Sequence, residues 1–242
     1  MTKERTWRAG ALFYKHVGSL AEAERLVGRA HWIARAGGNT PAAEYCPGRN
    51  AVAFPAIDGT TGVALIGKAA LSELLVPLQA IRRSGFPDLP VHDPLAKVMP
   101  RLAADAPQWL TGRVAHLADM ITDTGGVVHG DFHCGQLIRD GTGLVWVIDL
   151  EDMARGPVEA DLGNFVAHLA TRAETRQADL AEGVRFWAER VLDAWDRLGA
   201  TSDPALFWRY VDIALTRRAL KLRDERGEPG TLALLRHLPL FS

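Results

Sequence analysis

The sequence has little cysteine, no excess of charge of either sign and no long apolar run. Its two cysteines, Cys46 and Cys134, lie far apart and outside any metal-like spacing, which argues against a disulfide scaffold and favours a reducing compartment. Lys plus Arg (28) nearly equals Asp plus Glu (29), so no strongly basic domain indicates a nucleic-acid partner. No apolar run approaches the ~20 residues of a membrane span, and no apolar segment of a signal peptide follows MTKERTWRAG. We therefore expect a cytoplasmic protein with neither nucleic acid nor membrane as a partner.

What is present is the composition of an ordinary globular protein, with 242 residues, 48% hydrophobic and 24% charged. The short aromatic run ALFYKHV (residues 11–17) predicts a strand with Lys15 near its end. The next segment, SLAEAERLVGRAHWIARAGG, predicts a helix with Ser19 as its N-cap. A turn-rich stretch follows, and helical patterns dominate after it. We therefore expect a small N-terminal lobe of strands plus one helix (1–60) and a mostly helical lobe (61–242).

Polar side chains collect at the ends of two very apolar strands between Val127 and Met153. Asp149 ends the run LVWVID, and Glu151 and Asp152 follow at once. A structural explanation, in which these are turn residues, accounts for each residue singly. It accounts poorly for a carboxylate at the end of a buried strand, which costs energy unless a cation or a hydrogen-bond donor meets it.

Two chemical explanations remain for this segment. His129 and His133 are four apart, as in the zinc-binding HExxH helix, but the Glu is missing and the lead-in is strand-like. Phosphoryl transfer needs carboxylate and amide ligands for Mg²⁺ and an Asp near the attacking hydroxyl. Asp131, Gln136 and Asp149 supply these groups at the spacing of the kinase catalytic loop, with Gln in place of Asn. Phosphoryl transfer is the favoured hypothesis.

At these residues the sequence resembles a known family. HGDFHCGQLI, followed by VIDLEDMARGPVEADLGNF, is similar to the aminoglycoside phosphotransferase and choline kinase-like family. The resemblance implies an α+β, two-lobed protein-kinase-like fold and a phosphotransferase with an alcohol group as acceptor. It also implies ATP as the nucleotide, with GTP as the alternative, and Mg²⁺.

The family implies a role for each residue of the motif. Asp131 would accept or orient the proton of the acceptor hydroxyl, and Gln136 and Asp149 would hold Mg²⁺. His129 would be a structural member of the loop. Asp161, in EADLGNF, would be a buried carboxylate at a helix start that hydrogen-bonds the catalytic loop.

The family also implies nucleotide contacts in the N-terminal part. Lys15 would reach the nucleotide phosphates, with Glu24 on the following helix as its ion partner. The stretch FPAIDG resembles the hinge between lobes, where backbone groups of Ala56 and Ile57 would bind adenine.

The sequence departs from the family in two ways. Only about ten residues, with one glycine (Gly10), precede Ala11, where relatives carry a phosphate-covering hairpin. Either the phosphates are less covered, or a partner protein completes the lobe. Gln136 is one methylene longer than Asn. These features keep an alternative open, a catalytically impaired pseudokinase-like protein that binds a nucleotide, a peptide or a partner protein.

The acceptor is not specified by the sequence. Glu151 and Asp152 would suit an amine-bearing small molecule, as in antibiotic or natural-product metabolism. A Ser/Thr-containing biosynthetic peptide is the other acceptor, motivated by the short N-terminal part. Candidate contacts are basic residues in the helical part, namely Arg155, Arg217, Arg218, Lys221 and Arg223.

Overall fold

The computed structural model describes residues 6–86, 88–103, 106–118, 126–171, 180–227, 230–238 and 240–241. Contacts within the chain divide it into two compact units, each described here by itself. The first unit is Met1–Leu89 with Cys134–Met153, and the second is Pro90–His133 with Ala154–Ser242. The expected lobes 1–60 and 61–242 stay a prediction; the first unit also contains residues 61–89, and strand pairing joins residues 138–140 to residues 59–61.

The first unit contains a four-stranded antiparallel sheet in the order β1-β2-β4-β3. Its strands are β1 (Thr6–Ala9), β2 (Leu12–His16), β3 (Glu44–Cys46) and β4 (Ala51–Pro55). β2 coincides with the predicted strand, whereas β1 was not predicted. Gly10, at φ 63°, allows the tight turn between β1 and β2, and the paired Trp7 and Tyr14 rings stack at 5.4 Å.

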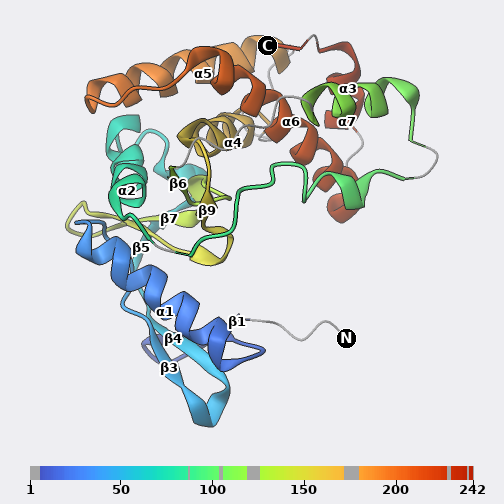
Figure 1. Ribbon diagram of the computed structural model, residues 1–242. Coiled ribbons are helices and arrows are strands. Elements are labelled where there is room, and N and C mark those ends of the chain that lie inside the picture. Colours follow the sequence, from blue (N-terminus) through green and yellow to red (C-terminus); the bar gives the residue numbers. More distant parts are fainter. Residues whose placement is uncertain are drawn as a thin grey trace. The chain divides into compact units, whose positions relative to one another are not determined.

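Helix α1 (Leu20–Arg35) packs on β3 and β4 of this sheet (Figure 1). Ser19 caps its N-terminus as predicted, since its Oγ accepts the Glu22 N–H at 3.2 Å. Its buried positions form one stripe at helical spacing: Ala23, Leu26, Arg29, Ala30 and Ile33. The stripe fixes which side chains of α1 face the rest of the unit.

A second, three-stranded sheet completes the first unit in the order β5-β7-β8. Its elements are β5 (Gly59–Thr61), β7 (Leu137–Asp140) and β8 (Val145–Val147), and helix α2 (Leu71–Arg83) packs against β8. Gly59 is required at the β5–β7 pairing, because an added Cβ would lie 2.3 Å from the Arg139 carbonyl oxygen. The loops that border β7 and β8 carry Gln136 and Asp149.

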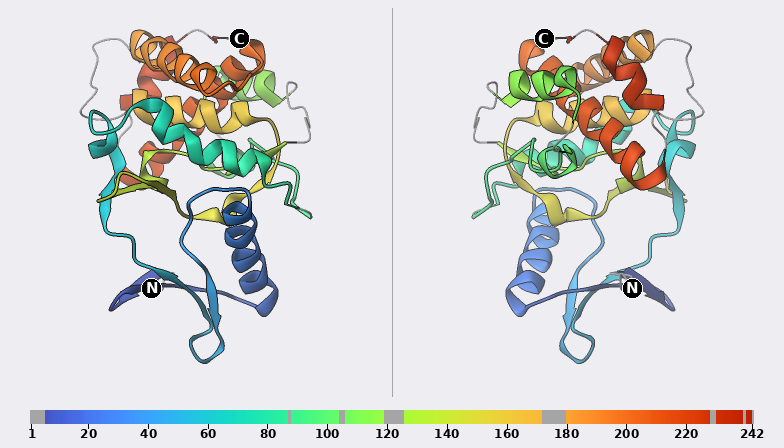
Figure 2. Two further views of the ribbon diagram at one scale, coloured as in Figure 1. Left: turned by 90° about the vertical axis from the view of Figure 1, so that its left-hand side faces the viewer. Right: turned by 90° about the vertical axis from the view of Figure 1, so that its right-hand side faces the viewer.

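The second unit is mainly helical around one apolar core. Its elements are α3 (Gln108–Ala118), β6 (Val127–Val128), β9 (Ala154–Arg155), α4 (Val158–Ala170), α5 (Leu180–Arg197), α6 (Pro204–Arg226) and α7 (Gly230–His237). α4 packs against both α5 and α6 (Figure 2). Gly163 permits the close approach of α4 and α6, because a Cβ there would lie 2.7 Å from backbone atoms of Tyr210 and Val211.

A buried ion pair ties α6 to α3. Arg113 Nη2 lies 2.7 Å from Asp212 Oδ1, and the two side chains are 7% and 0% exposed. Arg113 Nη1 also donates to the Leu238 carbonyl at 3.0 Å, and the Phe241 N–H donates to Asp212 at 2.9 Å. No helix among the described residues is both long and apolar enough to cross a membrane.

Candidate active site

The residues singled out from the motifs fall into two groups, one in each unit. Lys15, Gln136 and Asp149 lie in the first unit, and His129, Asp131 and Asp161 lie in the second.

Lys15, on β2, is held by two carboxylates. Its Nζ lies 2.6 Å from Asp149 Oδ1 and 2.9 Å from Glu151 Oε2. Burial alone would lower the pKa of this ammonium, but the hydrogen bonds and charges of Asp149 and Glu151 raise it above its ordinary value. Lys15 is therefore a cation that is positioned before any ligand arrives.

Asp149 has an unusual backbone, with φ 62° and ψ 60° in the left-handed region. That conformation costs a non-glycine residue of order 1–3 kcal/mol and recurs at functional sites. Gln136, the last residue of the short turn before β7, donates from Nε2 to Asp149 Oδ2 at 3.0 Å. Carboxylate and amide oxygens in one place are the donor set that suits Mg²⁺.

A cavity of about 330 Å³ opens beside these three residues. Lys15, Gln136 and Asp149 line it together with apolar side chains, among them Phe13, Leu26, Phe54, Ile57, Ile138 and Ile148. A mostly apolar wall with a few convergent polar groups is typical of a small-molecule site, and the volume lies in the usual range of such sites.

Of the two predicted hinge residues, Ile57 lines the cavity and Ala56 does not. The Ala56 N–H already donates to the Ala11 carbonyl at 2.8 Å. The adenine contact through backbone groups of Ala56 and Ile57 stays a prediction, and in this structure the Ala56 N–H is already engaged because β4 runs on into one more backbone hydrogen bond beside β2.

The predicted Lys15–Glu24 ion pair is not present in the described structure. Glu24 is exposed, one position away from the buried stripe of α1, and Lys15 pairs with Asp149 and Glu151 instead. The polar residue that α1 turns inward is Arg29, which is 6% exposed and donates to the carbonyls of Leu150 and Glu151. Arg29 thus holds the backbone that follows Asp149.

In the second unit, the loop after β6 is held by a buried carboxylate. Asp161, on α4, accepts the His129 N–H at 2.6 Å and the Gly130 N–H at 3.0 Å. Burial of this carboxyl group raises its pKa to about 6, although these donors and the nearby His129 act in the other direction. His129 is fully buried, and its Nδ1 lies 3.3 Å from the Asp131 N–H. Both side chains therefore hold the backbone of the loop that carries Asp131.

Asp131 is surrounded by hydrogen-bond donors and cations. Arg217 Nη2 is in direct contact with Asp131 Oδ1, and Asn164 Nδ2 lies 3.4 Å from the same oxygen. Burial alone would raise the pKa of Asp131, but Arg217 and Lys97 hold it well below its usual range. Asp131 is therefore ionised.

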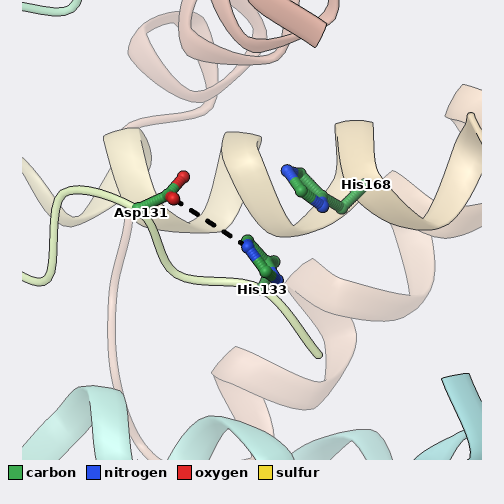
Figure 3. A group of neighbouring side chains, drawn as sticks. All are labelled: Asp131, His133 and His168. Atoms are coloured by element: carbon green, nitrogen blue, oxygen red, sulfur yellow. Dashed lines mark ion pairs between the residues drawn. The ribbon is translucent and has the colours of Figure 1, made fainter. Parts of the chain in front are cut away.

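Two histidines stack beside Asp131. The His133 and His168 rings lie 4.0 Å apart and nearly parallel, at 9°, and His133 Nε2 is 3.9 Å from Asp131 Oδ2 (Figure 3). Burial lowers the pKa of both, that of His133 to about 4, so both rings are neutral at pH 7. Ligand atoms of the three residues lie within 4.8 Å of one another. The nitrogen lone pairs of each imidazole lie in the plane of its ring, however, and the two planes are nearly parallel. One metal ion could therefore bind both rings only after one ring rotates.

The alternative of a zinc hydrolase built on His129 and His133 finds no support in the described residues. The group there that could hold a metal contains His133 but not His129. The His129 ring instead lies against the Asp131 N–H.

Four residues that contact the Lys15–Asp149 group or the Asp131 group were not predicted to do so from the sequence: Arg29, Glu151, Asn164 and His168. Asn164 follows Asp161 by three positions on α4, so it shares a helix face with it and reaches the Phe132 carbonyl at 2.9 Å. That spacing was a usable signal. Among the predicted basic contacts, Arg217 lies at Asp131, whereas Lys221 and Arg223 pair with Glu225 and Asp224 on α6.

Comparison with solved structures shows a kinase-like fold. A choline/ethanolamine kinase family protein from Mesorhizobium loti is 18% identical, with a TM-score of 0.63 over 96% of this chain and 81% of that one. Amicoumacin kinase, in complex with AMP-PNP, Ca²⁺ and amicoumacin, is 15% identical, with a TM-score of 0.65 over 97% and 87%. An aminoglycoside phosphotransferase from Streptomyces rimosus, in complex with ADP and streptomycin, is 18% identical, with a TM-score of 0.59 over 84% and 86%. The predicted α+β, kinase-like fold class is confirmed.

The family comparison covers most of the chain. No curated protein matches it. The model of the Phosphotransferase enzyme family (APH) matches residues 13–201, which include Lys15, both motif loops and α4. The predicted family and the prediction of an enzyme are confirmed, and the chain belongs to the Phosphotransferase enzyme family.

Proposed function

We propose that the protein transfers the γ-phosphoryl group of ATP, in a Mg²⁺-dependent reaction, to a hydroxyl group of a small molecule. The observation that supports this most directly is the convergence of Lys15, Gln136 and Asp149 on one cavity of about 330 Å³. An ammonium and a hard-oxygen donor set beside an apolar wall suit a purine nucleotide with its phosphates and a divalent cation. GTP is the alternative nucleotide.

In this proposal Gln136 and Asp149 hold Mg²⁺, which when bound neutralises charge on the nucleotide phosphates. The observed Gln136–Asp149 hydrogen bond fits this assignment, because it brings both side chains to one place before the ion binds. Lys15 contacts the phosphates, and Glu151 keeps the Lys15 ammonium oriented. Ile57 and its apolar neighbours pack on the base.

Asp131 accepts the hydrogen bond of the acceptor hydroxyl. The acceptor oxygen forms a bond to the γ-phosphorus as the bond from phosphorus to the β–γ bridging oxygen breaks, and the hydroxyl proton passes to Asp131. Asp161 and His129 fix the backbone of the loop from His129 to Asp131. Positioning and electrostatics of this kind supply most of the catalysis in phosphoryl transfer.

A small-molecule acceptor is favoured by the relatives, whose names include a choline/ethanolamine kinase and an amicoumacin kinase. A Ser/Thr-containing peptide as acceptor, a partner protein that completes the N-terminal lobe and a cytoplasmic location are sequence predictions that no comparison tests.

The test is calorimetric titration of ATP, with and without Mg²⁺, into the full chain. Wild type should bind ATP more tightly with Mg²⁺, and Asp149→Asn should lose that dependence. Asp131→Asn should keep nucleotide binding and lose transfer. Asp58→Asn is the matched control, since Asp58 lies in the same unit with a side chain that is 92% exposed. Absence of ATP binding by wild type would refute the nucleotide site.

A second experiment separates the proposed function from the alternative of a catalytically impaired, pseudokinase-like protein. That alternative predicts nucleotide binding without release of ADP in the presence of any hydroxyl compound. An acceptor screen by ADP release, with Asp131→Asn as the blank, distinguishes the two.

A further inference from the structure

A small cavity of about 20 Å³ lies beside Asp131 in the second unit. It is lined by Gly130 of the catalytic loop, Asn164 of α4, and Tyr210 and Arg217 of α6, with His92 at its wall. A cavity of this size holds one water molecule while Arg217 lies on Asp131, and a larger group needs the space that opens when Arg217, which forms part of its wall, moves. Two of its lining side chains, Tyr210 and Arg217, carry hydrogen-bond donors.

The first unused donor is the Tyr210 hydroxyl. Tyr210 is 3% exposed, and its hydroxyl has no hydrogen-bond partner within the described part of the chain. A buried hydroxyl without a partner is destabilising and calls for an explanation. Burial and the charge of Glu159 raise the pKa of Tyr210 to about 12, so the group remains a neutral donor.

The second donor is the Arg217 guanidinium, whose side chain is 14% exposed. It has five N–H bonds, and within the described residues its ion pair is with Asp131. That pair occupies an oxygen of the carboxylate that has to accept the acceptor hydroxyl. Arg217 therefore competes with the acceptor hydroxyl for this carboxylate.

The charges around the cavity disfavour a cationic acceptor. Arg217 and Lys97 both act on Asp131 with positive charge, and Arg218 on the same helix acts on His133 and His168. The carboxylate of Glu159 acts on Tyr210 with negative charge, and its Oε1 already accepts the Asp203 N–H at 2.7 Å. Glu151 and Asp152, which the sequence analysis considered for binding an amine, lie in the other unit.

We propose that the acceptor carries an anionic group beside its hydroxyl, and that Arg217 and the Tyr210 hydroxyl bind this group in the cavity between α4 and α6. The inference rests on the proposed function. Binding of the anion draws Arg217 away from Asp131, so the carboxylate becomes free to accept the hydroxyl of the same molecule. Carboxylate, phosphate and sulfate share the required chemistry, because each accepts a planar guanidinium through two oxygens.

This arrangement gives selectivity as well as affinity. An acceptor without an anion leaves Arg217 on Asp131, and an ammonium group meets two neighbouring cations. Arg217 therefore acts as a specificity-determining residue, and Tyr210 as the second donor that places the anion.

The first test needs no nucleotide, so it stays separate from the proposed function. Inorganic sulfate is titrated into the full chain at constant ionic strength set with chloride, and the midpoint of thermal unfolding is followed. Wild type should show a saturable rise. Arg217→Gln should weaken sulfate binding about 10- to 100-fold, and Tyr210→Phe about 3- to 10-fold. Arg209→Gln, a matched change elsewhere on α6, should bind sulfate like wild type.

Either of two results overturns the inference. One is the absence of a saturable sulfate effect in wild type. The other is a sulfate effect that survives Arg217→Gln, which would place the anion elsewhere, such as at Lys15. Competition by acetate and by inorganic phosphate then distinguishes carboxylate from phosphate as the preferred group. A protein that binds sulfate at Arg217 but does not bind ATP would retain this site and refute the proposed function.

Discussion

The buried pair Arg113–Asp212 provides a quantitative test of how α6, which carries Tyr210 and Arg217, is held in place. Asp212→Asn keeps the volume of the side chain but leaves the Arg113 guanidinium, only 7% exposed, without its counter-charge. Removing one partner of a buried pair typically costs about 3–5 kcal/mol. For a chain of this size each kcal/mol lowers the melting temperature by roughly 2–4 °C, so the expected fall is about 6–20 °C.

The assay is thermal unfolding followed by circular dichroism at pH 7.5. The matched control is Asp193→Asn, because Asp193 pairs with Arg197 at the same distance of 2.7 Å while the two side chains are 59% and 70% exposed. That pair contributes about 0.3–0.5 kcal/mol, so its loss should lower the midpoint by about 1–2 °C. The two variants change the same chemical group, and their sites differ in burial and in the Phe241 N–H that Asp212 also accepts.

A double-variant cycle sharpens the test. Arg113→Gln alone leaves the Asp212 carboxylate buried without its cation, and the double variant Arg113→Gln/Asp212→Asn leaves no charge unpaired. The double variant should therefore cost less than the sum of the two single variants, by roughly 0.5–3 kcal/mol. Strictly additive costs, or a loss for Asp212→Asn no larger than for Asp193→Asn, would show that the pair does not hold α6.

Three further outcomes are expected. The buried histidines His133, with a folded pKa of about 4, and His168, with a pKa well below its ordinary value, should lower folding stability as the pH drops from 6.5 towards 4, because both protonate first in the unfolded chain. Asp161, with a folded pKa of about 6, acts in the opposite direction over this range, so the histidine contribution is measured as a difference between proteins. Wild type should lose more stability than His133→Gln/His168→Gln in urea unfolding, by about 3 kcal/mol for the His133 shift alone; an equal pH dependence of the two proteins would contradict this. Arg29→Gln, which loses two hydrogen bonds to carbonyls, should lower stability by about 2–3 kcal/mol in the same assay and weaken ATP binding by calorimetry, whereas a stable variant with normal binding would argue against its positioning role. Gln136→Ala should raise the Mg²⁺ concentration needed for half-maximal ATP binding about tenfold, with metal-free ATP binding unchanged; an unaltered Mg²⁺ requirement would remove Gln136 from the metal site.

The parts of the site that a short sequence interval specifies could be predicted. Gln136 and Asp149 flank two paired strands, so their side chains meet wherever β7 and β8 form a hairpin. The position of Lys15 near the end of a strand could be predicted from two local patterns, an apolar strand and the capped helix that follows it. In each case local patterning and the observed contact agree.

Contacts that depend on which face of a helix is buried, or on pairing between distant segments, could not be predicted from the sequence. Glu24 and Arg29 both lie on α1, and only the observed stripe shows that Arg29 faces inward and Glu24 outward. β1 was missed because three of its four residues are exposed, so no apolar alternation marks it. Its stability as a strand depends on pairing with β2 and on the Trp7–Tyr14 stack.

The two carboxylates that the proposed reaction needs share a feature that neither motif reveals. Asp149 is paired with Lys15 in the first unit, and Asp131 with Arg217 in the second. A partly buried carboxylate without a cation or donors is costly, so each pair supports its unit while no ligand is bound. Ligands that use these carboxylates have to exchange with the resident cation, which links affinity to the stability of the free chain. It follows that Asp131→Asn, the natural choice for an inactive variant, also leaves Arg217 without its counter-ion. Loss of transfer in that variant is evidence about catalysis only when its melting temperature and its ATP binding are measured on the same sample.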